Sequence, residues 1–385
     1  MKKKLAKWVI AAVFAPFTSG ALGGEFTPGN LVIYRVGDGS ASLANTGNAV
    51  FLDEYTPAGT LVQSVALPTV ASGANKPLVA SGTATSEGLL TLSADGHYLM
   101  LTGYGAALPN ATSLAGSTVA STPRVIGRVD ALGNIDTSTA LTDWSDKNNP
   151  RSAVSTDGTN IWAGGAAGGV IYTTLGSTTS TQISSTVANI RQVNIFGGQL
   201  YASTSSGSTL RLGSVGSGVS NTTGQTITQL PGLPTSGSPY NYFLADLDSN
   251  TPGLDTLYLA DDTTANGEIL KYSLSGGSWI ADGAITAAGI RGLVGSVSGT
   301  TVTLYGTTGG SAAAGGGTLY GFTDTTGYNS AASGTASTLA TAATNEAFRG
   351  IAFVPTAIVT PEPALLGLIV PAGLLLARSR RRALR

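Results

Sequence analysis

The sequence predicts an all-β protein. Short apolar or alternating runs are separated by clusters of Gly, Asn, Asp and Ser, a pattern typical of strands joined by turns. No long stretch shows the period of about 3.6 residues that marks an amphipathic helix. The composition agrees, because 53 of the 385 residues are Gly and only 11% are charged. A chain of this length can bury a large core, so one β-rich domain of about 300 residues is reasonable.

A weak internal repeat narrows the fold class. Units with an apolar strand, a Gly-containing turn and a second apolar strand begin at Glu87, Arg151, Arg191, Tyr240 and Arg291. Their starts are 64, 40, 49 and 51 residues apart. Most of these spacings are close to the roughly 40 to 50 residues of a four-stranded propeller blade. The unit from Arg151 shows all four strands, so the repeat predicts a β-propeller.

The two ends of the body complete the count of blades. A sixth start at Arg349 is followed by only one strand, but three unpaired strands are available between Asn30 and Pro68. Joining them closes the ring and leaves no exposed sheet edge between the first and last blades. We predict six blades over residues 25–355, with seven as the alternative because the first unit is long. A right-handed β-helix is the competing fold.

The N-terminus has the order of parts of a secretory signal peptide. Lysines at positions 2, 3, 4 and 7 precede the apolar run from Trp8 to Phe17, and small residues follow between Ser19 and Gly23. Residues 1–23 are therefore predicted to be a signal peptide, and the mature protein to be exported.

The C-terminus, residues 360–385, combines a rigid turn, an apolar run and a basic cluster. Pro361 and Pro363 flank Glu362 and keep this stretch extended. The uncharged run from Ala364 to Ala377 would span about 21 Å as a helix, against roughly 30 Å for a bilayer core. Five arginines follow in the last eight residues, and the positive-inside rule leaves the body outside the cell.

This order of parts resembles the PEP-CTERM sorting signal. The resemblance implies recognition of Pro361, Glu362 and Pro363 by an exosortase-type membrane protease, with only transient membrane contact of the segment. It also implies delivery to the cell envelope, outer surface or extracellular matrix of a Gram-negative-type bacterium. The body is similar to propeller proteins that carry this tail, most clearly in the strands between Asn30 and Pro68. A permanent C-terminal anchor is the competing interpretation.

Charge and cysteine usage exclude several classes of protein. The chain has no cysteine, which rules out disulfides, thiolate metal sites and a cysteine nucleophile. The stretch from Glu25 to Pro355 has 11 basic and 20 acidic residues, a net charge of −9. Nucleic acid is therefore not an expected partner, because its phosphates require a basic face.

One acidic stretch is a candidate calcium loop. Counted from Asp246, oxygen-bearing side chains stand at positions 1, 3, 5 and 10, namely Asp246, Asp248, Asn250 and Asp255. Gly253 and Leu257 occupy places that do not fit an EF-hand. Calcium is therefore the one cofactor to consider. The alternative is a solvated turn, since Asp and Asn bond their own backbone in turns.

Arginines recur at the starts of the predicted innermost strands. In a propeller, Arg151, Arg191, Arg291 and Arg349 would meet at one mouth of the channel, where they could bind an acidic sugar or another anion. The favoured interpretation is that they bond carbonyls and carboxylates of the adjacent blade and hold the ring. Glu87, at the matching place of the first unit, fits the same structural role.

No group of residues in the sequence indicates catalysis. His97 is the only histidine, and it follows a turn with no nucleophile motif nearby. The pairs Asp53/Glu54 and Asp261/Asp262 are adjacent on predicted strands, so their side chains face opposite ways. We therefore predict a non-enzymatic structural or binding module for extracellular polysaccharide or surface proteins. The alternative is a propeller enzyme that acts on extracellular polysaccharide through Asp/Glu acid-base chemistry.

Overall fold

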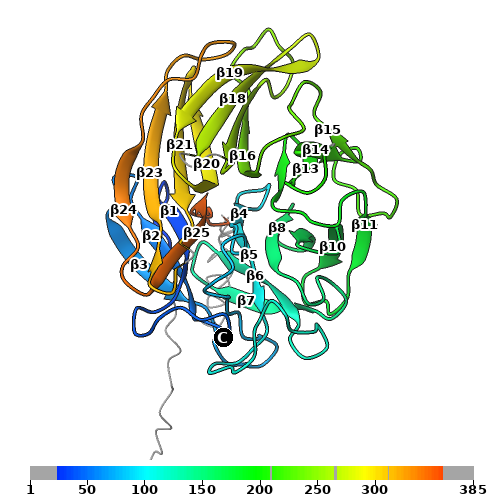
Figure 1. The fold of residues 1–385 in the computed structure, drawn as a ribbon, viewed down its shortest axis with the longest axis vertical. Helices are drawn as coiled ribbons and strands as arrows, with labels where there is room; N and C mark the ends of the chain where they lie inside the picture. The colour runs from blue at the N-terminus through cyan, green and yellow to red at the C-terminus, as the bar shows by residue number, and fades with distance from the viewer. Residues whose placement is uncertain (1–23, 209, 264–266, 311, 359–385) are drawn as a thin grey trace, which may run out of the picture.

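Six four-stranded antiparallel blades form the protein. The computed structural model describes residues 24–358 except 209, 264–266 and 311, and Figure 1 shows its blades arranged in a ring. The predictions for residues 1–23 and for 360–385, including Pro361, Glu362 and Pro363, lie outside the described residues. Within the described part of the chain, no helix is long and apolar enough to cross a membrane.

Each of the first five blades uses four strands in chain order, with the first strand nearest the axis. Blade 1 consists of β4 (Thr91–Leu92), β5 (Tyr98–Tyr104), β6 (Arg124–Asp130) and β7 (Ile135–Leu141). Blade 2 consists of β8 (Pro150–Ser155), β9 (Asn160–Gly165), β10 (Val170–Thr174) and β11 (Thr181–Ser184). Blade 3 consists of β12 (Val193–Phe196), β13 (Gln199–Ser203), β14 (Leu212–Val215) and β15 (Ile227–Gln229). Blade 4 consists of β16 (Pro239–Ala245), β17 (Thr256–Asp261), β18 (Glu268–Ser275) and β19 (Ser278–Thr286). Blade 5 consists of β20 (Ile290–Ser298), β21 (Thr301–Thr308), β23 (Thr318–Asp324) and β24 (Ser337–Thr341).

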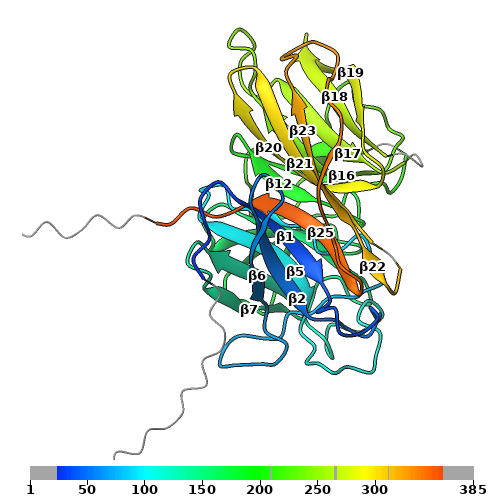
Figure 2. The same cartoon turned by 90° about the vertical axis from the view of Figure 1, so that its left-hand side faces the viewer.

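The sixth, closing blade takes strands from both ends of the body. Its order is β25 (Glu346–Phe353), β1 (Leu31–Val36), β2 (Val50–Tyr55) and β3 (Leu61–Ala66), and the short β22 (Gly315–Gly316) adds a parallel bridge to β25. Leu31 pairs with Phe353 and Ile33 with Ile351. The strands β1 and β25 lie side by side in Figure 2. The predicted closure by one C-terminal and three N-terminal strands is confirmed, as is the count of six, so the seven-blade and β-helix alternatives are wrong.

The core is divided among the contacts between neighbouring blades. Six buried apolar clusters each join two adjacent blades, so that every blade is covered on both faces. The alternation along β1 shows how one strand serves two clusters. Leu31 and Ile33 pack toward blade 5, while Val32 and Tyr34 pack toward blade 1, and all four side chains are fully buried. Period-two alternation thus supplies two apolar faces, which explains why these strands read as continuous apolar runs.

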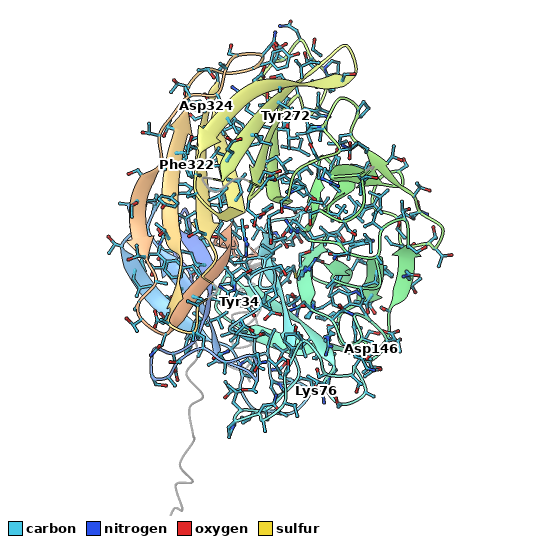
Figure 3. The ribbon with its side chains drawn as sticks, viewed as in Figure 1. Tyr34, Lys76, Asp146, Tyr272, Phe322 and Asp324 are labelled. Carbon is cyan, nitrogen blue, oxygen red and sulfur yellow. The ribbon has the colours of Figure 1, made fainter. Side chains whose placement is uncertain are left out.

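A buried ion pair also joins two blades. Lys271 of β18 lies 2.9 Å from Asp324 of β23, with both side chains inaccessible to solvent, and the Tyr258 hydroxyl donates to Asp324 at 2.8 Å. Burial alone would raise the pKa of Asp324, but hydrogen bonds, led by those from Thr326 and Lys271, hold it well below its usual range. Figure 3 labels Asp324 on blade 5.

A second ion-pair group fastens the closing blade. The Arg35 guanidinium of β1 lies 2.5 Å from the Asp53 carboxylate of β2 and 2.9 Å from the Glu346 carboxylate of β25. It also stacks over Phe51, with 4.1 Å between the guanidinium carbon and the ring centroid. One side chain therefore links the N-terminal strands to the C-terminal strand.

We predict that Arg35→Met lowers the free energy of unfolding by about 3 kcal/mol or more, because it leaves the Asp53 carboxylate buried without a cation. Urea unfolding of the full chain measures the change. The matched control is Arg128→Met, whose partner Asp136 is 3.4 Å away in a half-exposed pair and whose loss should cost less than about 1 kcal/mol. Equal losses in the two variants would contradict the role of Arg35 in ring closure.

Candidate axial site

Three of the four arginines stand on innermost strands, and the fourth lies just before one. Arg151 is on β8, Arg291 on β20 and Arg349 on β25, while Arg191 lies two residues before β12. Burial, with a smaller contribution from the nearby charge of Arg191, lowers the pKa of Arg151 to about 10. Burial also lowers the pKa of Arg349 to about 10, and the charge of Arg291 acts in the same direction. The charge of one arginine thus acts on the next in two pairs, Arg191 with Arg151 and Arg291 with Arg349.

The terminal nitrogens of the arginines donate to neighbouring loops and strands, whereas the Nε atoms of Arg151 and Arg349 have no partner among the described residues. Arg151 donates to the carbonyl of Ile190 at 3.1 Å and to the Asn189 side chain, at the entrance to blade 3. Arg191 donates to the hydroxyl of Ser238 at 2.7 Å, at the entrance to blade 4. Arg349 donates to the carbonyls of Gly310 at 2.7 Å and Gly82 at 3.2 Å. These contacts support the interpretation that the arginines hold the ring.

Two of the arginines share one acidic partner and one aromatic ring. Asp262 lies 2.8 Å from Arg291 and 3.7 Å from Arg191. The guanidinium carbons of Arg291 and Arg191 also lie over the ring of Tyr240, at 4.7 and 3.8 Å respectively from its centroid. The neighbouring Asp261 accepts instead from the backbone N–H of Ser238. Asp261, the last residue of β17, and Asp262, which follows it, thus serve different partners.

The other pair of adjacent carboxylates is also divided between two roles. Asp53 pairs with Arg35. Glu54, fully buried, accepts from the Asn30 amide at 2.6 Å and from the backbone of Thr27 at 2.8 Å. Neither carboxylate lines the axial cavity described below.

Glu87 lies in the connection that leads into blade 1. Its carboxylate accepts from the backbone N–H of Ser81 at 2.6 Å, the hydroxyl of Tyr104 at 2.8 Å and the amide of Asn149 at 2.9 Å. The side chain is only 3% exposed. Burial raises the pKa of Glu87 to about 7, although these hydrogen bonds and the charge of Arg349 oppose the rise. The carboxyl thus links the entrances of blades 1 and 2.

The candidate calcium loop forms a turn in the structure. Asp255 is fully buried and accepts from the backbone N–H groups of Leu247 at 3.0 Å and Asp248 at 2.7 Å. The Asp248 carboxylate accepts from the backbone and side chain of Asn250, while Asp246 is exposed. Among the described residues, no three acidic or histidine side chains form a group able to hold a metal ion. The hydrogen bonds of Asp255 and Asp248 within the loop therefore support the turn interpretation.

His97 follows the turn between β4 and β5. Its Nδ1 lies 2.8 Å from the carbonyl oxygen of Thr356, and the backbone N–H of Thr356 donates to Gly96 at 2.8 Å. The half-buried ring therefore helps to hold the segment that follows β25 against blade 1.

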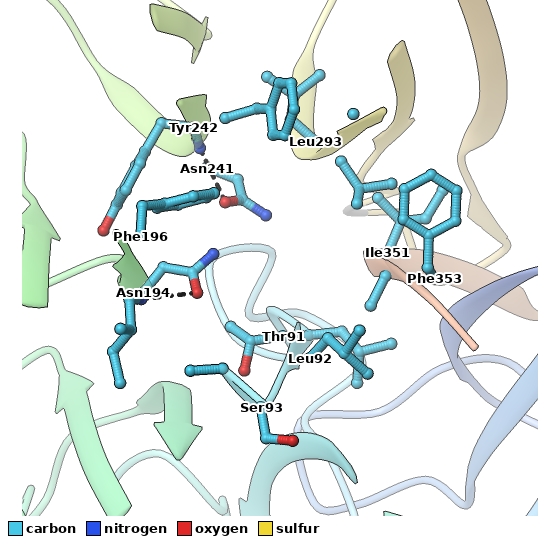
Figure 4. A pocket seen from close by; sticks show the side chains of 17 residues that line it. Thr91, Leu92, Ser93, Asn194, Phe196, Asn241, Tyr242, Leu293, Ile351 and Phe353 are labelled. Atoms are coloured by element: carbon cyan, nitrogen blue, oxygen red, sulfur yellow. Dashed lines mark hydrogen bonds between the residues drawn. The ribbon is translucent and has the colours of Figure 1, made fainter. Parts of the chain in front are cut away.

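An axial cavity of about 210 Å³ lies among the innermost strands (Figure 4). Its lining comes from five inner strands and adjoining residues, β4, β12, β16, β20 and β25, and it includes apolar side chains such as Leu92, Leu293 and Ile351. Two carboxamides, from Asn194 and Asn241, stand within this wall. A mostly apolar concavity with a few convergent polar groups is the usual form of a small-ligand site.

The sequence analysis did not predict a role for these carboxamides, although a short motif in the sequence marks both of them. An Asn-x-Phe motif occurs twice, as Asn194 to Phe196 and as Asn241 to Phe243, and each copy lies on an innermost strand. Residues two apart on a strand share a face, so each motif presents an amide and a phenyl ring together. Both phenyl rings line the cavity and lie 6.2 Å apart in an edge-to-face arrangement.

Comparison with solved structures finds proteins that are similar to this chain. No family model and no curated protein matches the sequence. A 6-phosphogluconolactonase-like protein of Bacteroides uniformis ATCC 8492 is 15% identical, with 86% of each chain covered and a TM-score of 0.42. One of Bacteroides fragilis NCTC 9343 is 13% identical, with 82% of each chain covered and a TM-score of 0.46. A hypothetical selenium-binding protein of Sulfolobus tokodaii is 10% identical over 84% of this chain and 93% of its own, with a TM-score of 0.44. At these values no residue role is transferred to this chain.

We predict that Glu87→Gln changes the pH dependence of stability. The folded pKa of about 7 lies above the ordinary value of 4.5. The contribution of this carboxyl to the free energy of unfolding is therefore fully present below pH 4.5 and is lost as the pH rises through about 7. Between pH 4.5 and pH 8, the free energy of unfolding of the variant should rise relative to that of the wild type by on the order of 3 kcal/mol. Urea unfolding at several pH values measures the gain, with Glu25→Gln at an exposed site as the control for net charge. A difference that stays constant with pH would contradict the prediction.

Proposed function

We propose that this chain is an exported propeller that an exosortase-type protease sorts to the cell envelope or extracellular matrix. There it acts as a non-catalytic binding module for a glycan or a surface protein. Export and sorting are supported by the order of parts at the two ends of the sequence, a basic and apolar N-terminus and a Pro-Glu-Pro tail with an apolar run and arginines. The acidic body and the absence of cysteine are compatible with that location.

The axial cavity is the observation that carries the binding role. It lies where five blades meet, and its wall combines apolar side chains with the amides of Asn194 and Asn241. Because these wall residues come from strands fixed by packing on both faces, the cavity is largely formed before any ligand arrives. Preorganisation of this kind reduces the entropic cost of binding.

The raised pKa of Glu87 is relevant to the alternative that the protein is an enzyme. A carboxyl with a pKa of about 7, as for Glu87, suits a general acid at neutral pH. However, Glu87 is 3% exposed, both of its oxygens already accept hydrogen bonds, and it does not line the cavity. A general acid must reach the substrate atom that it protonates, so this geometry favours a binding module over a hydrolase.

We predict that the full chain binds members of a glycan array saturably and hydrolyses none of them. Ala94→Trp should abolish binding, because Ala94 is an exposed residue at the cavity wall and a tryptophan there would block the cavity at little cost to folding. Ala94→Ser is the matched control and should bind normally. Turnover of a bound glycan would favour the enzyme, and binding unaffected by Ala94→Trp would place the site elsewhere.

A further inference from the structure

The polar groups that face the axial cavity are hydrogen-bond donors. The Oδ1 atom of Asn194 accepts from the backbone N–H of Ile195 at 2.9 Å, and the Oδ1 atom of Asn241 accepts from that of Tyr242 at 2.8 Å. Since the oxygen of each amide is fixed by this bond, the other end must be the NH₂ group. Figure 4 shows both nitrogens pointing into the space between the strands.

These two NH₂ groups have no protein partner among the described residues. Asn241 is 2% exposed and Asn194 is half-buried, and neither Nδ2 atom donates to another described side chain or backbone carbonyl. Neither nitrogen is among the fully buried polar atoms that lack a partner, so both are accessible from the cavity. A ligand that carries a hydrogen-bond acceptor can therefore reach both donors.

The hydroxyls of Thr91 and Ser93 in the wall are already engaged, whereas the buried hydroxyl of Tyr242 has no partner among the described residues. The Thr91 hydroxyl donates to the carbonyl of Ala153 at 2.6 Å, and the Ser93 hydroxyl donates to Asp95 at 2.6 Å while it accepts from Tyr98 at 2.9 Å. None of the 17 lining residues carries a formal charge. A carboxylate or ammonium group in this cavity would lose its hydration without an opposite charge in return. The occupant must therefore be neutral and must present an acceptor.

The aromatic and aliphatic wall adds a shape requirement. Phe196, Phe243 and Phe353 are partly exposed to the cavity, and Leu92 and Ile351 provide aliphatic surface. The volume of about 210 Å³ exceeds the roughly 150 Å³ of an apolar cavity that takes up benzene, so one six-membered ring with a small substituent fits. A phenyl face suits the C–H face of a pyranose ring, which a flexible peptide lacks.

We propose that the axial cavity binds a neutral sugar through an acetamido substituent. The carbonyl oxygen of that group has two lone pairs and accepts from the Nδ2 atoms of Asn194 and Asn241. Its methyl group packs against the aliphatic wall, and the pyranose ring lies against the phenylalanines. This assignment rests on the proposed binding function and narrows it, because it selects an N-acetylated neutral sugar over the acidic sugar that the arginines first suggested.

The test measures binding of methyl N-acetylglucosaminide to the full chain by titration calorimetry. Asn194→Leu and Asn241→Leu each remove one donor, and each should weaken binding by about fivefold, the value of one hydrogen bond of ordinary strength. Asn250→Leu, in the exposed loop after β16, is the matched control and should bind as the wild type does. Far-UV circular dichroism identifies any variant that fails to fold. If Asn241→Leu fails to fold, Asn194→Leu still tests the proposal, because Asn194 is less buried.

Three further probes decide the ligand class. Methyl glucoside lacks the acetamido group, methyl glucuronide is charged, and N-acetylglycine N-methylamide carries the acetamido group on a peptide. Weaker binding of all three than of methyl N-acetylglucosaminide supports the assignment. Equal or tighter binding of any of them overturns the ligand class but leaves a binding module in place. The assignment is overturned if the N-acetylated sugar does not bind, or if both Asn variants bind it as the wild type does. The proposed binding function is tested separately, by the glycan array and the Ala94→Trp variant.

Discussion

The pairing of β1 with β25 is the contact on which the rest of the structure depends. Strands such as β1 carry apolar side chains on both faces, so each blade needs a neighbour on either side to bury them. An open row of blades would expose one apolar face at each end and a free sheet edge. Pairing Ile33 with Ile351 brings together segments more than 300 residues apart in sequence and removes both exposures at once. The loop-closure entropy is offset by two interblade cores and by the ion pairs of Arg35.

Several of the few charged residues connect one blade with the next. Only 11% of the chain is charged, yet Arg124 of blade 1 is inaccessible to solvent and donates to the carbonyls of Ser145 and Asn148 in the connection to blade 2. Polar loops at blade entrances leave carbonyl groups that strands do not satisfy, and a guanidinium with five donors satisfies several of them together. This explains why the arginines at the mouth hold the ring more than they offer a site to an anion.

Pattern and spacing were enough to predict the fold but only part of the candidate site. Alternation and turn residues predicted the four strands of the unit that begins at Arg151, because local periodicity indicates which faces are buried. The same pattern cannot say which side chains from different blades share a space. Asn194 and Asn241 are 47 positions apart and meet only because the ring brings β12 and β16 together. Likewise, the oxygen spacing around Asp255 suggested calcium, whereas the backbone N–H groups of its own loop take up that carboxylate.

The cavity and the closure of the ring share one strand, which couples ligand binding to the integrity of the fold. Ile351 and Phe353 line the cavity and also pair with Ile33 and Leu31. The cavity exists only when β25 is in place, so a ligand there binds the closed ring and not the open chain. A ligand with this preference stabilises the closed state by an amount that grows with the logarithm of its concentration. A ligand that accepts from Asn194 and Asn241 would therefore also stabilise the pairing of β1 with β25, where the two ends of the body meet.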